Sequence, residues 1–310
     1  MKALVATQYG GFENLMFHDI EKPIPGEGEV LIKIKAASVN PVDWKLLSGY
    51  REEKIHAIFP YIIGWDMSGT IESNGHAARK FDVGDKVYGY IRRPILKHGS
   101  YAEYLCVPEC YVCKAPEKIS LKDSSAVPLA GLTAYQALTT FGHLRRGETL
   151  MILGAAGGVG TFAVQIAKYL GATIIAVASS ANLEFLKNIG ANICLDYSDP
   201  EWVSRISMNP PDFILDCVGG ETRDKGVPAI KKGGRVISTT AYKFHDETIN
   251  FNGMFVEPHS RNLDHLTTMI DQGYLKPYVT KYFKFENAIE ALKLNTEGRT
   301  RGKIVINISD

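Results

Sequence analysis

The alternation of hydrophobic and polar residues changes character near residue 120. Before this point, runs such as Val30–Ala37 alternate apolar and cationic residues, which predicts strands with one solvent-exposed face. Beyond it, a short apolar run such as Thr149–Leu153 is followed by apolar residues at helical spacing up to Leu170. The pattern therefore predicts a β-rich region followed by alternating strands and helices.

The first region, residues 1–120, carries Gly and Pro at irregular intervals between short strands, which favours a small, partly open barrel. Its expected strands are Lys2–Ala6, Val30–Ala37, Met67–Glu72, Lys86–Tyr90, Ala102–Val107 and Tyr111–Lys114.

The second region, residues 121–257, begins with a helical segment at 120–141 and continues as strand–helix units. Its expected strands are Thr149–Leu153, Thr173–Ala178, Asn192–Leu195, Phe213–Leu215, Arg235–Ser238 and Thr248–Phe251. We expect helices between them, including one that starts at Asp199 and one over 221–231. This order predicts an α/β, doubly wound parallel sheet. In the last segment, 258–310, we expect a helix at Phe283–Leu294 and a strand at Lys303–Ile308.

A glycine-rich turn joins the strand Thr149–Leu153 to the helix that follows it. The turn carries Gly154, Gly157, Gly158 and Gly160. Glycines allow a sharp turn, a close approach of a pyrophosphate and tight packing of helix on strand, while the free N–H groups of the helix face the anion. The spacing GxxGxxG alone also fits an ordinary glycine-rich turn. The strand–helix order that follows favours a dinucleotide site.

The end of the second strand bears on which dinucleotide binds. NAD sites carry an Asp or Glu there for the ribose 2′-hydroxyl. Here Ser179 and Ser180 follow the strand, and the first acidic residue after the strand is Glu184. Two hydroxyls can donate to a 2′-phosphate, so NADPH is favoured over NADH. The serines can equally cap the next helix.

Polar residues also follow two strands of the first region. Asn40 precedes a proline, which predicts an extended backbone, and its amide stands at a strand end, where side chains often line clefts. Asn40 and Asp43 can equally cap a helical turn. Asp66 is either a catalytic acid or, as we favour, a buried structural one. The aromatic residues Tyr50 and Trp65, with Tyr90 and Ile91, fit an apolar pocket or the core.

Composition excludes several classes of function. The net charge of +1 offers no electrostatic reason to bind nucleic acid or an anionic membrane. No apolar run reaches the length of a membrane span, and the N-terminal residues lack the apolar core of a signal peptide. The five cysteines form an odd, sparse set, so we expect a cytoplasmic protein without disulfides. Three of them, Cys106, Cys110 and Cys113, are too loosely spaced to favour a zinc site.

Several motifs in order resemble the zinc-free medium-chain dehydrogenases/reductases of the quinone oxidoreductase type, the family that includes zeta-crystallin. The resemblance covers essentially the full chain. It rests on AASVNPVDWKLLSG (36–49), GWDMSGTI (64–71), FDVGDKVYG (81–89), GSYAEY (99–104), PLAGLTAYQAL (128–138), GAAGGVGTFAVQIAK (154–168), LDCVGG (215–220), GGRVIST (233–239) and GRTRGKIVI (298–306).

The resemblance implies a GroES-like catalytic domain, residues 1–120 completed by 258–310, around a Rossmann domain at 121–257. It implies that Asn40 and Thr133 lie near the nicotinamide, and that Ala156, Gly157, Gly158 and Val159 hold the pyrophosphate. It further implies contacts of the cofactor with Ser179, Ser180, Tyr197, Arg301, Cys217, Val218, Thr239, Phe255 and Val256. Family members often dimerise through edge strands, here near Thr248–Phe251. Many also carry a Lys where this chain has Asn182.

Zinc-dependent relatives carry a Cys and a His-Glu pair where this chain has Ser38–Asn40 and Trp65-Asp66. We therefore expect no metal. Without one, reduction of a quinone or an α,β-unsaturated carbonyl by NADPH is favoured, with Asn40 or Tyr50 as the hydrogen-bond donor to the developing oxyanion. Two alternatives stay open: an enoyl-thioester reductase, and an NADPH-binding scaffold or sensor with little turnover.

Overall fold

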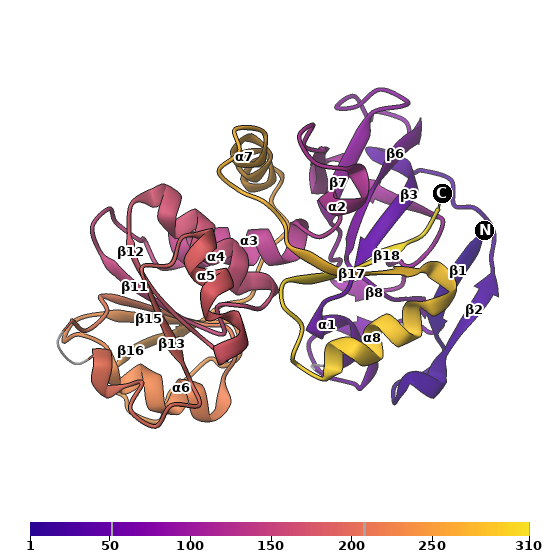
Figure 1. Cartoon of the computed structure of the whole chain (residues 1–310). Coiled ribbons are helices and arrows are strands. Elements are labelled where there is room, and N and C mark those ends of the chain that lie inside the picture. Colours follow the sequence, from indigo (N-terminus) through magenta and orange to yellow (C-terminus); the bar gives the residue numbers. More distant parts are fainter. Residues whose placement is uncertain (51, 207–208, 310) are drawn as a thin grey trace. The chain divides into compact units, whose positions relative to one another are not determined.

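The chain folds into two compact units. The computed structural model describes residues 1–50, 52–206 and 209–309. The first unit comprises Met1–Leu129, Glu257–Gly273 and Val279–Asp310, and the second comprises Ala130–Val256 and Tyr274–Tyr278 (Figure 1). The first unit thus extends beyond the expected boundary at residue 120, to Leu129.

Side-chain hydrogen bonds hold two of these segments to their units. The short helix α2 (Leu121–Ser124) is held to the first unit because the Ser68 hydroxyl donates to the carbonyl of Leu121. The segment Tyr274–Tyr278 belongs to the second unit, where the Gln165 side chain bonds both the N–H and the carbonyl of Lys276, at 2.9 and 3.0 Å.

The first unit is built on a seven-stranded sheet. Its path is β10 (Val112–Lys114), β7 (Lys86–Tyr90), β6 (Asp66–Asn74), β3 (Glu29–Ser38), β18 (Lys303–Asn307) and β17 (Val279–Lys284), and β9 (Tyr104–Pro108) also pairs with β3. A smaller antiparallel sheet joins β2 (Leu15–Asp19), β1 (Lys2–Ala6) and β5 (Tyr61–Ile62), and β4 (His56–Ala57) pairs with β8 (Ile95–Leu96). In β3, Val30, Ile32 and Ile34 are buried and Lys33 is exposed, as the alternating pattern predicts, but Leu31 and Ala37 on the same face as Lys33 are buried too.

The C-terminal segment returns to this sheet, where the yellow strand β18 lies antiparallel beside β3 (Figure 1). The expected helix at Phe283–Leu294 is wrong at its start. Residues up to Lys284 form strand β17, and helix α8 covers Ala288–Thr296, because the pairing with β18 extends to Lys284. Helix α7 (Ser260–Asp271) was not expected, although Leu263, Leu266 and Ile270 are buried at helical spacing.

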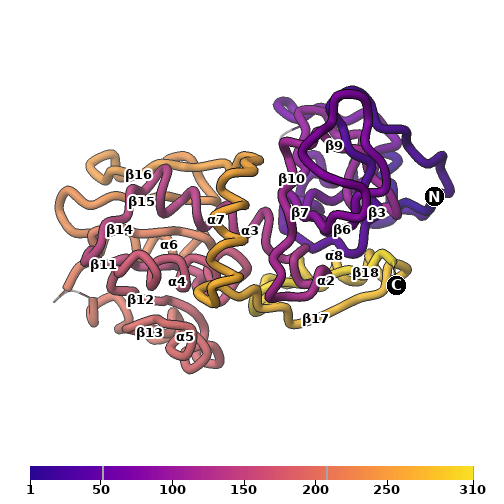
Figure 2. The backbone as a smooth tube through the Cα atoms, turned by 90° about the horizontal axis from the view of Figure 1, so that it is seen from above, coloured from indigo at the N-terminus to yellow at the C-terminus, as the bar shows by residue number. Residues whose placement is uncertain are grey.

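The second unit is the predicted doubly wound parallel sheet. Its strands lie in the order β13 (Ile193–Asp196), β12 (Thr173–Ala178), β11 (Thr149–Leu153), β14 (Phe213–Asp216), β15 (Arg235–Ser238) and β16 (Asn250–Gly253) (Figure 2). Every pairing is parallel. In chain order within the unit this is 3-2-1-4-5-6, the order of dinucleotide-binding folds.

The helices of this unit are α4 (Gly158–Leu170), α5 (Leu183–Ile189), α6 (Gly220–Gly226) and most of α3 (Pro128–Gln136), which continues as a π-helical turn, Ala137–Phe141. The helix expected from Asp199 is wrong: turns and a short 3₁₀ helix, Ser204–Ile206, occupy the described residues there. Trp202 is instead buried in the core beneath the sheet, and Pro210 and Pro211 prevent a longer helix. The helix expected over 221–231 ends early, at Gly226.

Candidate active site

The turn between β11 and α4 has the geometry of an anion site. Gly154 adopts a positive φ of 79°, which side chains other than glycine rarely tolerate. A Cβ on Gly160 would lie 2.5 Å from the carbonyl oxygens of Gly154 and Ala155, so only glycine allows this close packing. The N-cap residue Gly157 offers no side-chain acceptor to the helix, and the first turn contains no acid. The N–H groups at the start of α4 are therefore available to a phosphate.

Strand register places most of the other predicted cofactor residues of the second unit at the carboxyl ends of its parallel strands. Leu153, the last residue of β11, lies opposite Val177 of β12 and Asp216 of β14, and Asp216 lies opposite Ser238 of β15. The residues that follow these strands include Ala156, Gly157, Gly158, Val159, Ser179, Ser180, Cys217, Val218 and Thr239. Phe255 and Val256 follow β16, and Thr133 lies on α3, where it is nearly buried. Tyr197 follows β13 and is about half exposed.

Asp216 orders the carboxyl ends of these strands, although it is not among the predicted site residues. Its carboxylate is fully buried. It accepts hydrogen bonds from the N–H groups of Val218 and Gly219 at 3.1 and 2.8 Å, and from the hydroxyls of Ser238 and Thr240 at 2.6 and 2.8 Å. One side chain thus fixes the loops after β14 and β15. Its sequence signals were an acid at the end of a short apolar strand and a place in the motif LDCVGG (215–220).

The two serines after β12 have different partners. The Ser179 hydroxyl oxygen accepts from the side-chain amide of Asn182 at 2.9 Å, which leaves its O–H free to donate. Ser180 instead bonds Asp196, at the end of β13, whose pKa is lowered by hydrogen bonds from Ser198 first and from Ser180. Asp196 lies opposite Ala178 in the register. A carboxylate therefore lies beside this loop, although none follows β12 directly along the chain.

In the first unit, β3 runs into helix α1 (Pro41–Leu47) through Asn40. Its backbone is extended, with φ −129° and ψ 149°, as its position before a proline predicts. Asp43 supplies the cap, because its Oδ2 accepts from the backbone N–H of Asn40 at 2.8 Å. The amide of Asn40 points elsewhere: its Nδ2 donates to Asp66 Oδ2 at 2.8 Å, and its Oδ1 accepts from Lys303 Nζ at 2.5 Å.

Asp66 and Lys303 are both buried, with 0% and 4% of their side chains exposed. Asp66 accepts from the Ser38 hydroxyl and the N–H of Leu129, each at 2.7 Å, and is thus a hydrogen-bonded buried acid, the interpretation the sequence favoured. Lys303 Nζ also donates to Val39 O at 3.0 Å and lies 3.5 Å from Asp66 Oδ2. Burial lowers the pKa of Lys303, and the two neighbouring carboxylates oppose this shift.

Asp43 completes a polar cluster that we define as Ser38, Asn40, Asp43, Asp66, Tyr101 and Lys303. The Tyr101 hydroxyl donates to Asp43 Oδ2 at 3.2 Å, while Asp43 Oδ1 is buried and has no partner among the described residues. Burial raises the pKa of Asp43 to about 7. Near neutral pH the cluster therefore holds an exchangeable proton.

The aromatic residues divide between the core and the surface. Trp65, Tyr90 and Ile91 are buried, and the Trp65 and Tyr90 rings pack edge to face at 5.9 Å, so these three belong to the core. Tyr50 is 43% exposed. Arg301 lies just before β18, half-buried. Asn40, Tyr50 and Arg301 are the predicted site residues that belong to the first unit.

No group of three or more His, Cys, Asp or Glu residues is arranged to hold a metal ion within the described ranges. Cys106 and Cys113 are buried, and Cys110 is exposed. The part of the chain that the structure describes also contains no helix long and apolar enough to cross a membrane.

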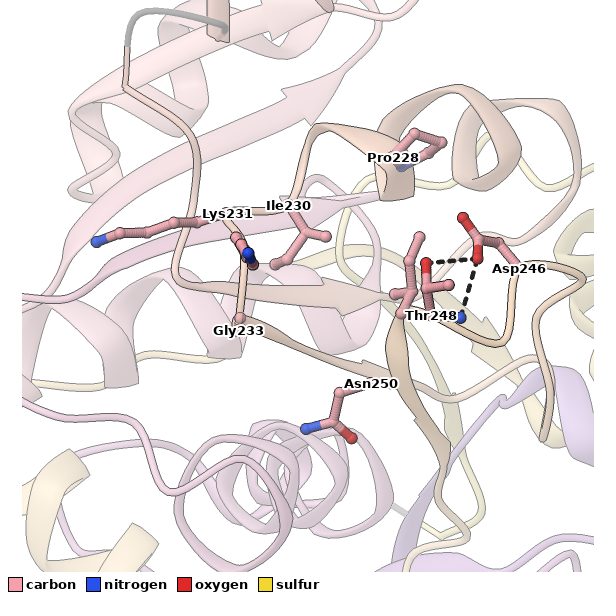
Figure 3. Close-up of a pocket in the computed structure, with 10 residues that line it drawn as sticks. Pro228, Ile230, Lys231, Gly233, Asp246, Thr248 and Asn250 are labelled. Carbon is pink, nitrogen blue, oxygen red and sulfur yellow. Dashed lines mark hydrogen bonds between the residues drawn. The ribbon is translucent and has the colours of Figure 1, made fainter.

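A hollow of about 410 Å³ lies at the amino ends of β15 and β16, at the opposite ends of the strands from the candidate nucleotide site (Figure 3). Its lining includes Ile230, Lys231 and Asn250, and Asp246 accepts from the N–H and the hydroxyl of Thr248 at 2.9 and 2.6 Å. The carboxyl ends of these strands carry the candidate nucleotide site, so the hollow is not part of it. Dimerisation through the neighbouring strand β16 stays a prediction.

Comparison with known proteins gives the family. Residues 26–117 match the model of the alcohol dehydrogenase GroES-like domain, and residues 189–306 match that of a zinc-binding dehydrogenase. The chain is 33% identical to the 2-methylene-furan-3-one reductase of Solanum lycopersicum, over 99% of this chain and 79% of that protein. It belongs to the quinone oxidoreductase-like family of the medium-chain dehydrogenases/reductases.

Two further relatives agree with this assignment. The mitochondrial NAD(P)H oxidoreductase RTN4IP1 of Mus musculus is 30% identical over 99% of this chain and 89% of its own. The solved quinone oxidoreductase of Coxiella burnetii superimposes with a TM-score of 0.89 at 30% identity, covering 100% of this chain and 99% of that one. The GroES-like domain and the Rossmann sheet predicted from sequence are therefore confirmed.

Proposed function

We propose that this NAD(P)H-type oxidoreductase uses NADPH to reduce a quinone or an α,β-unsaturated carbonyl, without a metal. The observation that carries the proposal is the uncapped N-terminus of α4, which offers backbone N–H groups at the edge where a dinucleotide crosses such a sheet. The names of the relatives support the acceptor class, because one reduces an enone and another a quinone.

The residues of the second unit would bind and orient the cofactor. The turn Ala156–Val159 would hold the pyrophosphate, and the free O–H of Ser179 would donate to the 2′-phosphate. Asp216 would keep the loops with Val218 and Thr239 in place around the ribose. When bound, NADPH supplies a hydride from its nicotinamide ring.

Asn40 is the proposed hydrogen-bond donor to the substrate oxygen. One N–H of its amide donates to Asp66 Oδ2. The other makes only a long contact, with 3.5 Å between Asn40 Nδ2 and Ser38 O. The reduced acceptor would carry negative charge on its carbonyl oxygen until it takes a proton from solvent, and this second N–H would stabilise that charge. No metal is needed, because conjugation already spreads the charge.

The test is NADPH oxidation by the purified protein with a series of quinones and enones, with and without a chelator, and with NADH in parallel. We expect turnover that the chelator leaves unchanged and a preference for NADPH. Cofactor binding without oxidation by any acceptor would instead support a scaffold or sensor. Turnover that the chelator abolishes would contradict the metal-free reaction.

A further inference from the structure

Lys303 is the one residue of the polar cluster that comes from the C-terminal strand. Strand β18 pairs with β3 with Val305 opposite Ser38, which brings Lys303 beside the point where β3 ends and Asn40 begins. Its ammonium donates to Val39 O and to Asn40 Oδ1 and approaches Asp66. A buried cation costs free energy unless its partners compensate, so its place beside this amide calls for an explanation.

The amide of Asn40 lies between two opposite charges. The Lys303 ammonium is 2.5 Å from its oxygen, and the Asp66 carboxylate is 2.8 Å from its nitrogen. The two contacts admit only one orientation, because a rotated amide would face its N–H groups toward the ammonium and its oxygen toward the carboxylate. A cation on the carbonyl oxygen also draws electron density from the nitrogen, which makes the remaining N–H a stronger donor.

We propose that Lys303 is a positioning residue that orients and polarises the amide of Asn40, so that its second N–H stabilises the substrate oxyanion. This inference rests on the proposed function. The cation acts on the substrate through one amide, and Lys303 itself does not touch the substrate.

The first experiment needs no turnover. In protein labelled with ¹⁵N-asparagine, the side-chain signals of Asn40 are assigned by their loss in Asn40→Asp. We expect Lys303→Met to move these signals upfield and leave the other asparagine side chains unchanged. Lys284→Met is the matched control, since Lys284 ends the neighbouring strand β17 and is largely exposed. Unmoved Asn40 signals in folded Lys303→Met would overturn the proposal.

The second experiment is kinetic. We expect Lys303→Met to lower kcat about tenfold with an enone, less than the 10²–10³ seen when an oxyanion donor itself is removed, and to change the KM for NADPH less than about twofold. In an Asn40→Ala background, Lys303→Met should have no further effect on kcat. Additive losses, or an unchanged kcat in the single variant, would contradict the proposal.

Removal of the ammonium leaves Asp66 buried without its cation, so the single variant can fail to fold. The charge-neutral pair Lys303→Met with Asp66→Asn then replaces it, compared with Asp66→Asn alone. If wild-type protein reduces no quinone or enone, the proposed function fails, while the ¹⁵N experiment still decides whether Lys303 polarises Asn40.

Discussion

The two candidate regions differ in the chemical groups that they offer to a ligand. The carboxyl ends of the strands in the second unit, where we expect the nucleotide, offer backbone N–H groups and small residues. Their one buried acid, Asp216, hydrogen-bonds the neighbouring loops and is not proposed to contact the ligand. The polar cluster of the first unit uses side chains, with Asp43, Asp66 and Lys303 buried together. A site for a large anion needs space and donors, whereas a site for a small oxyanion needs one donor held in place. Four predictions test this contrast, from the largest effect to the smallest.

Asp66→Ala should be the most destabilising change. It removes the carboxylate that accepts hydrogen bonds from the Ser38 hydroxyl, the Asn40 side-chain amide and the N–H of Leu129. It also leaves the buried Lys303 ammonium without the carboxylate of its ion pair. We expect a loss of about 3–5 kcal/mol in the free energy of unfolding, measured with urea.

The matched control is Glu72→Ala on the same strand β6. Its partner Lys22 is exposed, so the loss of Glu72 should destabilise the protein far less than the loss of Asp66. Equal effects of the two substitutions would mean that the cluster is no more than a surface ion pair.

Gly157→Asp should separate cofactor binding from stability. Gly157 has φ −75° and ψ 179°, which an aspartate can adopt, and its Cβ would meet only Gly154 O, at 3.4 Å. Aspartate is a good N-cap, so we expect unchanged or higher stability. Its carboxylate would occupy the anion position, and the Kd for NADPH should rise at least about 100-fold, equivalent to about 2.7 kcal/mol.

Titration of NADPH by fluorescence measures this Kd. The uncharged Gly157→Asn is the control, and it should lose less affinity than the aspartate variant. Tight NADPH binding by Gly157→Asp would place the pyrophosphate elsewhere.

Asp43 gives the first unit a predictable pH dependence. Its pKa is raised from 3.8 to about 7 in the folded state, so the folded protein holds a proton that the unfolded chain releases. Stability from this residue is therefore fully present below about pH 4 and lost as pH rises to 7.

Asp43→Asn keeps an acceptor for Asn40 and Tyr101 and removes the titration. Relative to wild type, its free energy of unfolding should rise between pH 4 and pH 7 by more than about 1.4 kcal/mol, the equivalent of one pKa unit. Urea unfolding at several pH values measures this difference. A difference independent of pH would show that folding leaves the pKa of Asp43 at its ordinary value.

Asp196→Asn should sharpen the choice of cofactor. The carboxylate bonds Ser180 beside the loop that we expect to meet the 2′-phosphate, so its removal lowers repulsion. We expect the preference for NADPH over NADH to rise about fivefold, or about 1 kcal/mol. Asp199→Asn is the control, since that acid already pairs with Arg205. An unchanged ratio of the two kcat/KM values would remove Asp196 from cofactor selection.

The sequence predicted an element correctly where its structure depends on residues close together in the chain, and less well where distant residues decide it. The strands Thr149–Leu153 and Thr173–Ala178 have the predicted bounds, because each is an apolar run between turn residues. The helix after Asp199 was wrong: the segment forms turns that bury Trp202 in the core of the unit, although Asp199 can cap a helix. Helix α7 was missed, although its buried residues had helical spacing.

By itself the sequence determined the order of strands and helices, the glycine turn and the extended backbone at Asn40, since each depends on residues close together in the chain. Only the tertiary structure decided that Lys303 meets Asn40 and that Asp196 stands beside Ser180. Both depend on which strands become neighbours. Hydrogen bonding between strands can bring residues 263 positions apart within 2.5 Å, and no local pattern encodes that meeting.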